Sequence, residues 1–305
     1  MRLVIALGGN ALLQRDEPQD MVTQRRNIRQ AARVLGEVIR DGHDIVLTHG
    51  NGPQVGLLAL QAPQCPLDIL VAESQGQIGY MLQQALAVEC PSREVITLLT
   101  QTRVDLDDPA FLTPTKYIGP VYQKSESEDV SARYGWMMAQ EGEFWRRVVP
   151  SPLPKEIIEI GTIKRLISQN ILVIASGGGG IPVAKIPGQL DEMEGVEAVI
   201  DKDRTAALLA QSIEADALVI LTDVAGVYLG DYRGNYRGNH AAESNLIKEI
   251  SVQELTTHSF PAGNMGPKVA AACEFVHATG RVAMIGALSQ LSEMLRKEAG
   301  THIRQ

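Results

Sequence analysis

Three lysine residues lie where an ammonium group could bind the phosphates of an anionic substrate. Lys202 follows Asp201, a predicted N-cap, and therefore falls in the first turn of a predicted helix. Lys268 follows Pro267, a residue type that is common at the first helical position. A cation at a helix start opposes the helix dipole at a cost of about a few tenths of a kcal/mol, which a bound anion would offset. Lys116 follows a Pro-Thr pair, and each of the three lysines could instead be a solvated surface charge.

Glycine-rich or polar turns follow four predicted strands and could bind phosphate through their backbone. Glycine lets N–H groups approach an anion closely, and a helix N-terminus after the turn adds a favourable dipole. Ligands of open parallel sheets bind outside the carboxyl ends of the strands, so the four turns would form one groove for a polyanion. Alternatively, each turn only closes a tight corner between a strand and a helix. The turns span residues 8–11, 48–54, 176–182 and 222–228.

Two acidic residues and one histidine accompany these turns. Asp203 could orient the ammonium group of Lys202, or simply be a favourable acid in the first helical turn. Asp223 ends a predicted strand, where its carboxylate could reach a nucleotide or Mg²⁺, or cap a turn. His49 could be a general base, but a structural role with a hydrogen-bonded ring is the better interpretation.

Common nucleotide-binding and catalytic fingerprints are absent from the sequence. It contains no G-x-x-x-x-G-K-[ST], no G-x-G-x-x-G at the first predicted helix and no G-x-S-x-G. Neither H-x-x-x-H nor a cluster of Cys and His with metal-ligand spacing occurs. Phosphate binding would therefore depend on glycine turns and lysines, and no metal site made by protein side chains is predicted.

Alternating strands and helices must position these residues. Short, continuous apolar runs are typical of strands buried on both faces of a parallel sheet. Between them, residues 20–41 place Ile28, Leu35 and other apolar side chains on one helical face, and residues 77–88 show similar spacing. The pattern predicts an α/β sandwich with a largely parallel sheet. The predicted strands span residues 3–7, 44–48, 95–99, 171–175, 217–222 and 282–285.

Two regions interrupt this alternation. Residues 103–155 are rich in Pro, Asp and aromatic residues and contain both tryptophans, Trp136 and Trp145, which favours an insertion or lid. Residues 230–243 repeat a Tyr-Arg-Gly-Asn unit, which we interpret as a polar hairpin or loop.

Composition narrows the classes of function. The chain has 305 residues, a net charge of −8 and only three scattered cysteines. An acidic chain is not expected to bind nucleic acid or an anionic membrane, although local lysines can still hold a small anion. The absence of a cysteine pattern, of a signal-peptide pattern and of a long apolar run indicates a cytoplasmic protein.

The ordered set of motifs closely resembles the carbamate kinases of the amino acid kinase superfamily. The resemblance runs almost from end to end of the chain, and the motifs are specific in combination, in their order and spacing. They lie at residues 6–11, 49–56, 75–80, 114–120, 145–152, 176–183, 197–203 and 266–268.

This resemblance implies a fold, a reaction and an assembly. The fold would be a three-layer αβα sandwich, with a mainly parallel sheet of about eight strands and a small subdomain protruding at about residues 113–150. Residues 1–165 would form a lobe for carbamate and the phosphoryl group, and residues 166–305 a nucleotide-binding lobe. The reaction would be ATP + carbamate = ADP + carbamoyl phosphate, with Mg²⁺, in a cytoplasmic homodimer that makes ATP during breakdown of arginine or other carbamoyl sources.

The resemblance also assigns site residues by position. Lys116 would reach the substrate from the protruding subdomain, while Lys202 and Lys268 would flank the bridging phosphates and Asp203 would hold the lysines in place. Carbamate is already an anion, so no general base is required. The substrate would lie against Gly8, Gly9, Asn10, Gly50, Asn51 and Gly52. The nucleotide would lie against Gly178, Gly179, Asp223, Ala225, Val227 and Tyr228.

The chain departs from the family pattern at a few positions. Glu143 and Phe144 replace an Arg and a Gly, Ala225 replaces an acid, and Asn264 replaces a Ser. These departures leave two other hypotheses open beside carbamate kinase: another small-acid kinase of the same fold, and a non-catalytic nucleotide or carbamoyl-phosphate sensor.

Overall fold

An eight-stranded sheet forms the centre of the molecule, in the order β13-β15-β14-β12-β1-β2-β9-β3. The computed structural model describes residues 1–12, 17–18, 20–186, 192–228, 246–260 and 265–305. Two of the strands were not predicted, β13 (Glu249–Ser251) and β15 (Thr301–Arg304), and β15 runs antiparallel to β14. The other six confirm the predicted strands, as β1 (Arg2–Leu7), β2 (Asp44–His49), β3 (Val95–Thr97), β9 (Leu172–Ile174), β12 (Ala217–Thr222) and β14 (Val282–Ala287).

Side chains of both faces of this sheet are buried, as the continuous apolar runs predict. In β1, Val4 and Ala6 pack into one hydrophobic cluster, whereas Leu3, Ile5 and Leu7 pack into another. Because successive side chains of a strand point to opposite faces, the two clusters lie on opposite faces of the sheet. Both faces therefore require helices to cover them.

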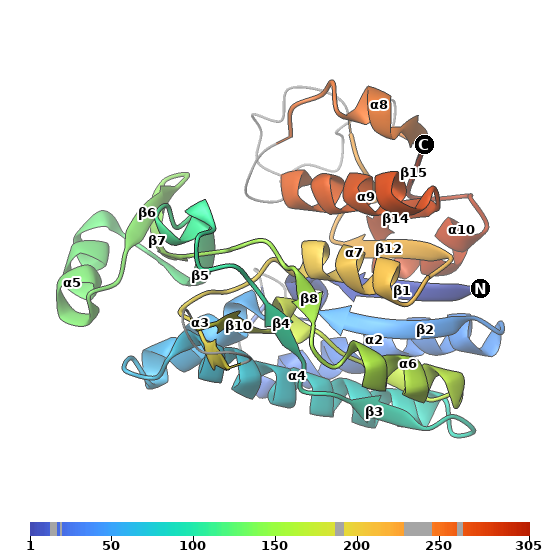
Figure 1. Cartoon of the computed structure of the whole chain (residues 1–305), viewed down its shortest axis with the longest axis horizontal. Coiled ribbons are helices and arrows are strands. Elements are labelled where there is room, and N and C mark those ends of the chain that lie inside the picture. The colour runs from blue at the N-terminus through green and yellow to red at the C-terminus, as the bar shows by residue number, and fades with distance from the viewer. Residues whose placement is uncertain (13–16, 19, 187–191, 229–245, 261–264) are drawn as a thin grey trace.

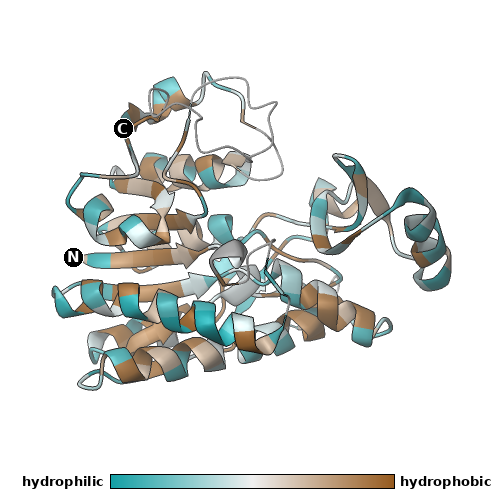
Figure 2. Cartoon of the chain, turned by 180° about the vertical axis from the view of Figure 1, so that it is seen from behind, coloured by the Kyte–Doolittle hydropathy of each residue, from teal (hydrophilic) through white to brown (hydrophobic). Residues whose placement is uncertain are grey.

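Helices cover both faces and give the three layers of the predicted αβα sandwich (Figure 1). In Figure 2, apolar segments lie mostly on the sheet and on the helix faces turned toward it. The predicted helix at 20–41 is confirmed as α2, whereas α4 begins ten residues before the predicted 77. Leu67 to Gly76 continue the same buried face, with Leu70, Val71 and Ser74 inside. One face carries α2 (Met21–Arg40), α4 (Leu67–Glu89) and α10 (Leu291–Leu295), and the other α6 (Ile160–Ser168), α7 (Lys202–Ser212), α8 (Val252–Leu255) and α9 (Met265–Thr279).

Short elements follow the strand ends and line the edge where the site is expected. Helix α1 (Gly9–Leu12) follows β1, α3 (Gly52–Gln61) follows β2, and a 3-10 turn at Gly177–Gly179 follows β9. A second sheet lies beside them in the order β11-β10-β4-β8. Its strands are β4 (Gln101–Arg103), β8 (Glu156–Ile157), β10 (Ile181–Lys185) and β11 (Met193–Gly195).

A separate subdomain, which we call the lid (residues 113–150), protrudes from the sandwich and confirms that part of the predicted fold (Figure 1). Its sheet has the order β5-β7-β6, and α5 connects β5 to β6. It contacts the main body through α3, where Gly56 lies so close to Gly119 that a Cβ at position 56 would collide with the Cα of Gly119. The lid elements are β5 (Lys116–Tyr122), α5 (Lys124–Tyr134), β6 (Met138–Glu141) and β7 (Phe144–Val149).

The predicted polar loop at 230–243 lies outside the described residues. Among the helices of the described ranges, none combines the length and the apolar character needed to span a membrane.

Candidate active site

The turns after β1 and β2 meet at the carboxyl end of the sheet. The Gly8 N–H donates to the carbonyl of Leu221 at 3.0 Å, and the Gly50 N–H donates to the carbonyl of Leu7 at 2.9 Å. A Cβ on Gly50 would lie 2.9 Å from the Gly9 nitrogen and 3.3 Å from Cδ of Lys202. Only glycine fits such an approach. The two predicted substrate turns therefore lie against each other, and the turn at Gly50 also lies against the aliphatic stem of Lys202.

The glycine turn after β9 lies against the same two regions. Gly178, Gly179 and Gly180 have φ values of 65°, 94° and 88°, which favour glycine. A Cβ on Gly178 would collide with the amide of Asn51, and one on Gly179 would lie 2.5 Å from the carbonyl oxygen of Ile200. The structure therefore brings the predicted nucleotide turn beside the predicted substrate turn and the segment that leads to Lys202.

Asp203 joins two lysines from different helices. Its Oδ1 accepts a hydrogen bond from Lys202 Nζ, and its Oδ2 accepts one from Lys268 Nζ at 3.1 Å. The three side chains are at most 11% exposed, which places two ammonium groups and one carboxylate in a largely dry environment. The predicted role of Asp203 as the residue that orients these lysines agrees with this geometry.

Asp201 holds the third lysine. It is the predicted N-cap of α7, where its Oδ1 accepts from the backbone N–H groups of Asp203 at 3.0 Å and Arg204 at 3.3 Å. Its Oδ2 accepts from Lys116 Nζ at 2.9 Å. The ion pair joins residues 85 positions apart and was missed, because no spacing signal in the sequence connects them.

Opposing charges set the ionisation of this cluster. Burial lowers the pKa of Lys202, whereas carboxylates led by Asp203 outweigh burial and raise the pKa of Lys268. Burial opposes the charged forms of Asp201 and Asp203, but the lysines outweigh it and hold the pKa of both acids below the usual range. The lysines therefore favour the ionised form of both carboxylates.

The buried residues around the turns are structural supports. His49 is 1% exposed, and burial lowers its pKa to about 4, so its ring is neutral near pH 7. Its Nδ1 lies 3.2 Å from the carbonyl oxygen of Gly50. The amide of Asn51 donates to Ser74 Oγ at 2.8 Å, which fixes the turn before α3. These contacts favour the structural interpretation of His49 over a general base.

The predicted nucleotide residues after β12 show mixed placement. Asp223 lies close enough to Lys268 to help raise the pKa of that lysine. Val227 is fully buried in the core, and its N–H donates to Thr301 Oγ1 at 2.8 Å. Tyr228 forms an isolated antiparallel bridge with Leu246. The side chain of Val227 therefore belongs to the hydrophobic core, and its backbone is engaged as well, because its carbonyl accepts from the Ile247 N–H at 2.9 Å.

One local prediction was wrong. Helix α9 begins at Met265, so Pro267 is its third residue and not its first. Proline is tolerated there because the first helical N–H groups have no partner within the helix. Lys268 remains in the first turn, while Asn264 lies outside the described residues.

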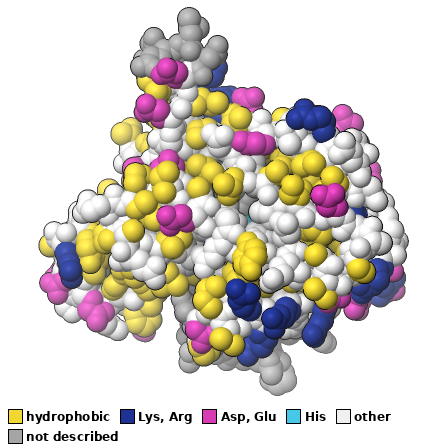
Figure 3. Space-filling view, turned by 90° about the horizontal axis from the view of Figure 1, so that it is seen from below, with side chains coloured by type: hydrophobic (Ala, Val, Ile, Leu, Met, Phe, Trp, Pro, Cys, Tyr) yellow, Lys and Arg dark blue, Asp and Glu magenta, His cyan; other side chains and the backbone are white. Residues whose placement is uncertain are grey.

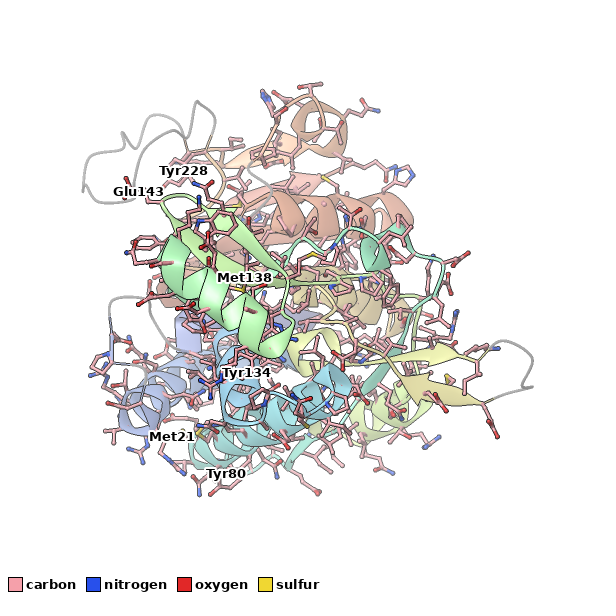
Figure 4. All side chains as sticks on the ribbon, turned by 90° about the vertical axis from the view of Figure 1, so that its left-hand side faces the viewer. Met21, Tyr80, Tyr134, Met138, Glu143 and Tyr228 are labelled. Atoms are coloured by element: carbon pink, nitrogen blue, oxygen red, sulfur yellow. The ribbon has the colours of Figure 1, made fainter. Side chains whose placement is uncertain are left out.

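Of the altered lid residues, Phe144 is 40% exposed, and Figure 4 shows Glu143 on the lid with Tyr134 and Met138.

Comparisons with known proteins identify the family of this chain. The model of a family described as "Amino acid kinase family" matches residues 1–286 of this chain. The carbamate kinase of Rhizobium meliloti (strain 1021) is 49% identical, over 99% of this chain and 93% of that protein. The carbamate kinase of Escherichia coli (strain K12) is 47% identical, over 99% of this chain and 98% of that protein.

A solved structure extends the similarity to three dimensions. The carbamate kinase from Giardia lamblia bound to citric acid matches with a TM-score of 0.90 and 41% identity, covering 99% of this chain and 98% of that chain. With the match over residues 1–286 and the glycine turns and lysines arranged as described, this chain belongs to the amino acid kinase family.

Proposed function

We propose that the protein is a carbamate kinase, which transfers a phosphoryl group reversibly between ATP and carbamate. The observation that carries the proposal is the convergence of Lys116, Lys202 and Lys268 on two carboxylates beside three glycine turns. Identities of 49% and 47% to carbamate kinases over 99% of the chain support carbamate as the acceptor. A non-catalytic sensor is not favoured, because all three lysines are retained and converge.

The chemistry requires little beyond position and charge. A carbamate oxygen attacks the γ-phosphorus, the bond to the β–γ bridging oxygen breaks, and ADP leaves with that electron pair. Charge accumulates on the phosphoryl and bridging oxygens, where fixed donors and cations stabilise it. Because carbamate is an anion, a neutral and buried His49 is compatible with the reaction.

Each group of residues has a distinct part in this proposal. The turns at Gly8, Gly9 and Asn10 and at Gly50, Asn51 and Gly52 would bind carbamate and the phosphoryl group through backbone N–H groups. Lys202 and Lys268 would neutralise the bridging phosphates, and Asp203 would orient both. Lys116 would approach from the lid. Residues 1–165 would thus bind the acceptor, while residues 166–305, with Gly178, Gly179 and the segment from Asp223 to Tyr228, would bind the nucleotide.

Magnesium would enter as part of the nucleotide substrate. Within the described ranges, no group of three or more His, Cys, Asp or Glu residues could hold a metal ion. Both oxygens of Asp203 accept from lysines, so that carboxylate suits cation pairing better than metal ligation. Bound to the phosphates, Mg²⁺ would offset charge that the lysines do not reach.

The proposed setting is the cytoplasm, where the enzyme would act as a homodimer. Three free cysteines suit a reducing compartment. There the reaction would run mainly toward ATP, during breakdown of arginine or of another carbamoyl source.

An acyl-phosphate panel tests the acceptor. We expect ATP formation from ADP, Mg²⁺ and carbamoyl phosphate, with kcat/KM about 100-fold or more above that with acetyl phosphate, which lacks the amino group. Equal use of both acyl phosphates, or phosphorylation of an amino-acid carboxylate instead, would assign the site to another small-acid kinase.

A further inference from the structure

Asp201 connects the lid to the helix that carries Lys202, because the two oxygens of its carboxylate accept hydrogen bonds from different segments. Oδ1 caps α7 by accepting from Asp203 and Arg204, and Oδ2 accepts from Lys116 at 2.9 Å. We infer that Asp201 is a positioning residue, which holds the Lys116 ammonium group in register with Lys202 and Lys268 for phosphoryl transfer. This inference rests on the proposed function for its kinetic consequence.

Lys116 needs such a partner because its backbone belongs to the lid and not to the central sheet. It is the first residue of β5, on a sheet separate from the central sheet, and its side chain is 24% exposed. A lysine side chain loses rotamer freedom when it is fixed, so an unpaired Lys116 would sample many positions. Its ammonium group has three donors, and the bond to Asp201 uses one of them. The other two can bind the substrate while the ion pair persists.

A second bond ties the same two segments. The Val199 N–H donates to the carbonyl of Pro150 at 2.9 Å, just after the last lid strand and just before Asp201. The lid base is therefore linked to the start of α7 by one main-chain bond and one ion pair. These two bonds restrict movement of the lid relative to Lys202 at Lys116, where β5 begins.

The variant Asp201→Asn separates the capping of α7 from the ion pair with Lys116. Asparagine is as good an N-cap as aspartate, so the start of α7 is retained while the charge that pairs with Lys116 is lost. We expect kcat for ATP formation to fall about tenfold to 100-fold, because misplacing a reacting group by about 1 Å can cost that much. The KM for ADP should stay within about twofold. The matched control is Asp20→Asn, which changes the N-cap of α2 and should leave kcat unchanged.

A double-variant cycle shows whether Asp201 acts through Lys116. In a Lys116→Ala background, Asp201→Asn should lower kcat by less than about threefold further, because the partner is already gone. Losses that multiply would mean that Asp201 acts independently of Lys116 and would overturn the inference. So would an Asp201→Asn enzyme with the wild-type kcat.

Hydrogen–deuterium exchange tests the link without any turnover. We expect backbone amides of β5 to exchange about threefold faster or more in both Asp201→Asn and Lys116→Ala, and at the wild-type rate in Asp20→Asn. Unchanged exchange in β5 would overturn the inference even in an active enzyme. If the wild-type protein makes no ATP from carbamoyl phosphate, the proposed function fails, whereas faster exchange in β5 would still support the ion-pair link.

Discussion

At the scale of single residues, Asp203 separates two ammonium groups that would otherwise repel each other. It is 2% exposed, and Lys202 and Lys268 are each 9% exposed. Replacing it by alanine leaves two buried cations without a counter-charge, a change that costs about 3–5 kcal/mol of unfolding free energy. We expect urea denaturation of Asp203→Ala to show such a loss, whereas Asp129→Ala on the exposed side of α5 should stay within about 0.5 kcal/mol of wild type. An Asp203→Ala protein as stable as wild type would contradict a charge role for this carboxylate.

His49 predicts a pH dependence of stability. Its folded pKa is lowered to about 4 from an ordinary 6.5, so between these values the unfolded chain binds a proton that the folded chain does not. Stability is therefore fully present above pH 6.5 and decreases as the pH falls toward 4. From pH 7 to pH 5 this residue should remove about 2 kcal/mol of unfolding free energy.

Urea denaturation at both pH values measures that loss. His49→Gln should reduce the pH dependence by about the same 2 kcal/mol, and His258→Gln, at an exposed position, should retain the wild-type dependence. An unchanged dependence in His49→Gln would contradict a buried, neutral ring.

Residue-level predictions from sequence succeeded where the signal was local. Lys202 and Asp203 are adjacent in the chain, and a charge at a helix start is a recognisable cost, so their pairing could be anticipated. The partner of Lys116 could not, because Asp201 already had a sufficient local role as an N-cap. Asp201 and Asp203 lie two residues apart, and tertiary packing decides which lysine pairs with each carboxylate.

At the scale of elements, the apolar composition of a strand decided whether it could be predicted. The strand β12 is buried at all six positions and reads as a continuous apolar run. By contrast, β13 has three residues, two of them Glu249 and Ser251, and β15 contains Thr301 and His302. Neither strand has a continuous apolar run, and both form only because a central sheet is available to pair with.

The contact between α3 and the lid should be sensitive to one methyl group. A Cβ at Gly56 would collide with Gly119, so Gly56→Ala must displace the lid from α3. We expect kcat to fall about tenfold or more and stability to fall by about 1–3 kcal/mol. The matched control is Gly76→Ala in α4, where a Cβ meets nothing within 4 Å. That variant should be as active as wild type, and equal behaviour of the two variants would contradict a tightly fitted lid.

At the scale of the whole molecule, an exposed apolar face on α4 favours the proposed homodimer. Ile69, Tyr80 and Val88 are 46%, 54% and 75% exposed, and Figure 3 shows hydrophobic side chains in patches on the side of the molecule where α4 lies. Exposed patches of this kind mark association surfaces. Sedimentation equilibrium should give about twice the chain mass of 33.1 kDa, and Tyr80→Glu should shift the protein toward monomer. A wild-type mass of one chain at micromolar concentration would contradict the dimer.

The most direct test of the central claim is ATP formation from ADP, Mg²⁺ and carbamoyl phosphate by wild type, Lys116→Ala, Lys202→Ala and Lys164→Ala. Lys164 is an exposed lysine of α6 and serves as the matched control. We expect turnover by wild type and Lys164→Ala, and a loss of about 10²–10³ in kcat for the other two, comparable with removal of an oxyanion-hole donor. Wild-type turnover that survives loss of either converging lysine would contradict the proposed site, and no turnover by any of the four would contradict the proposed reaction.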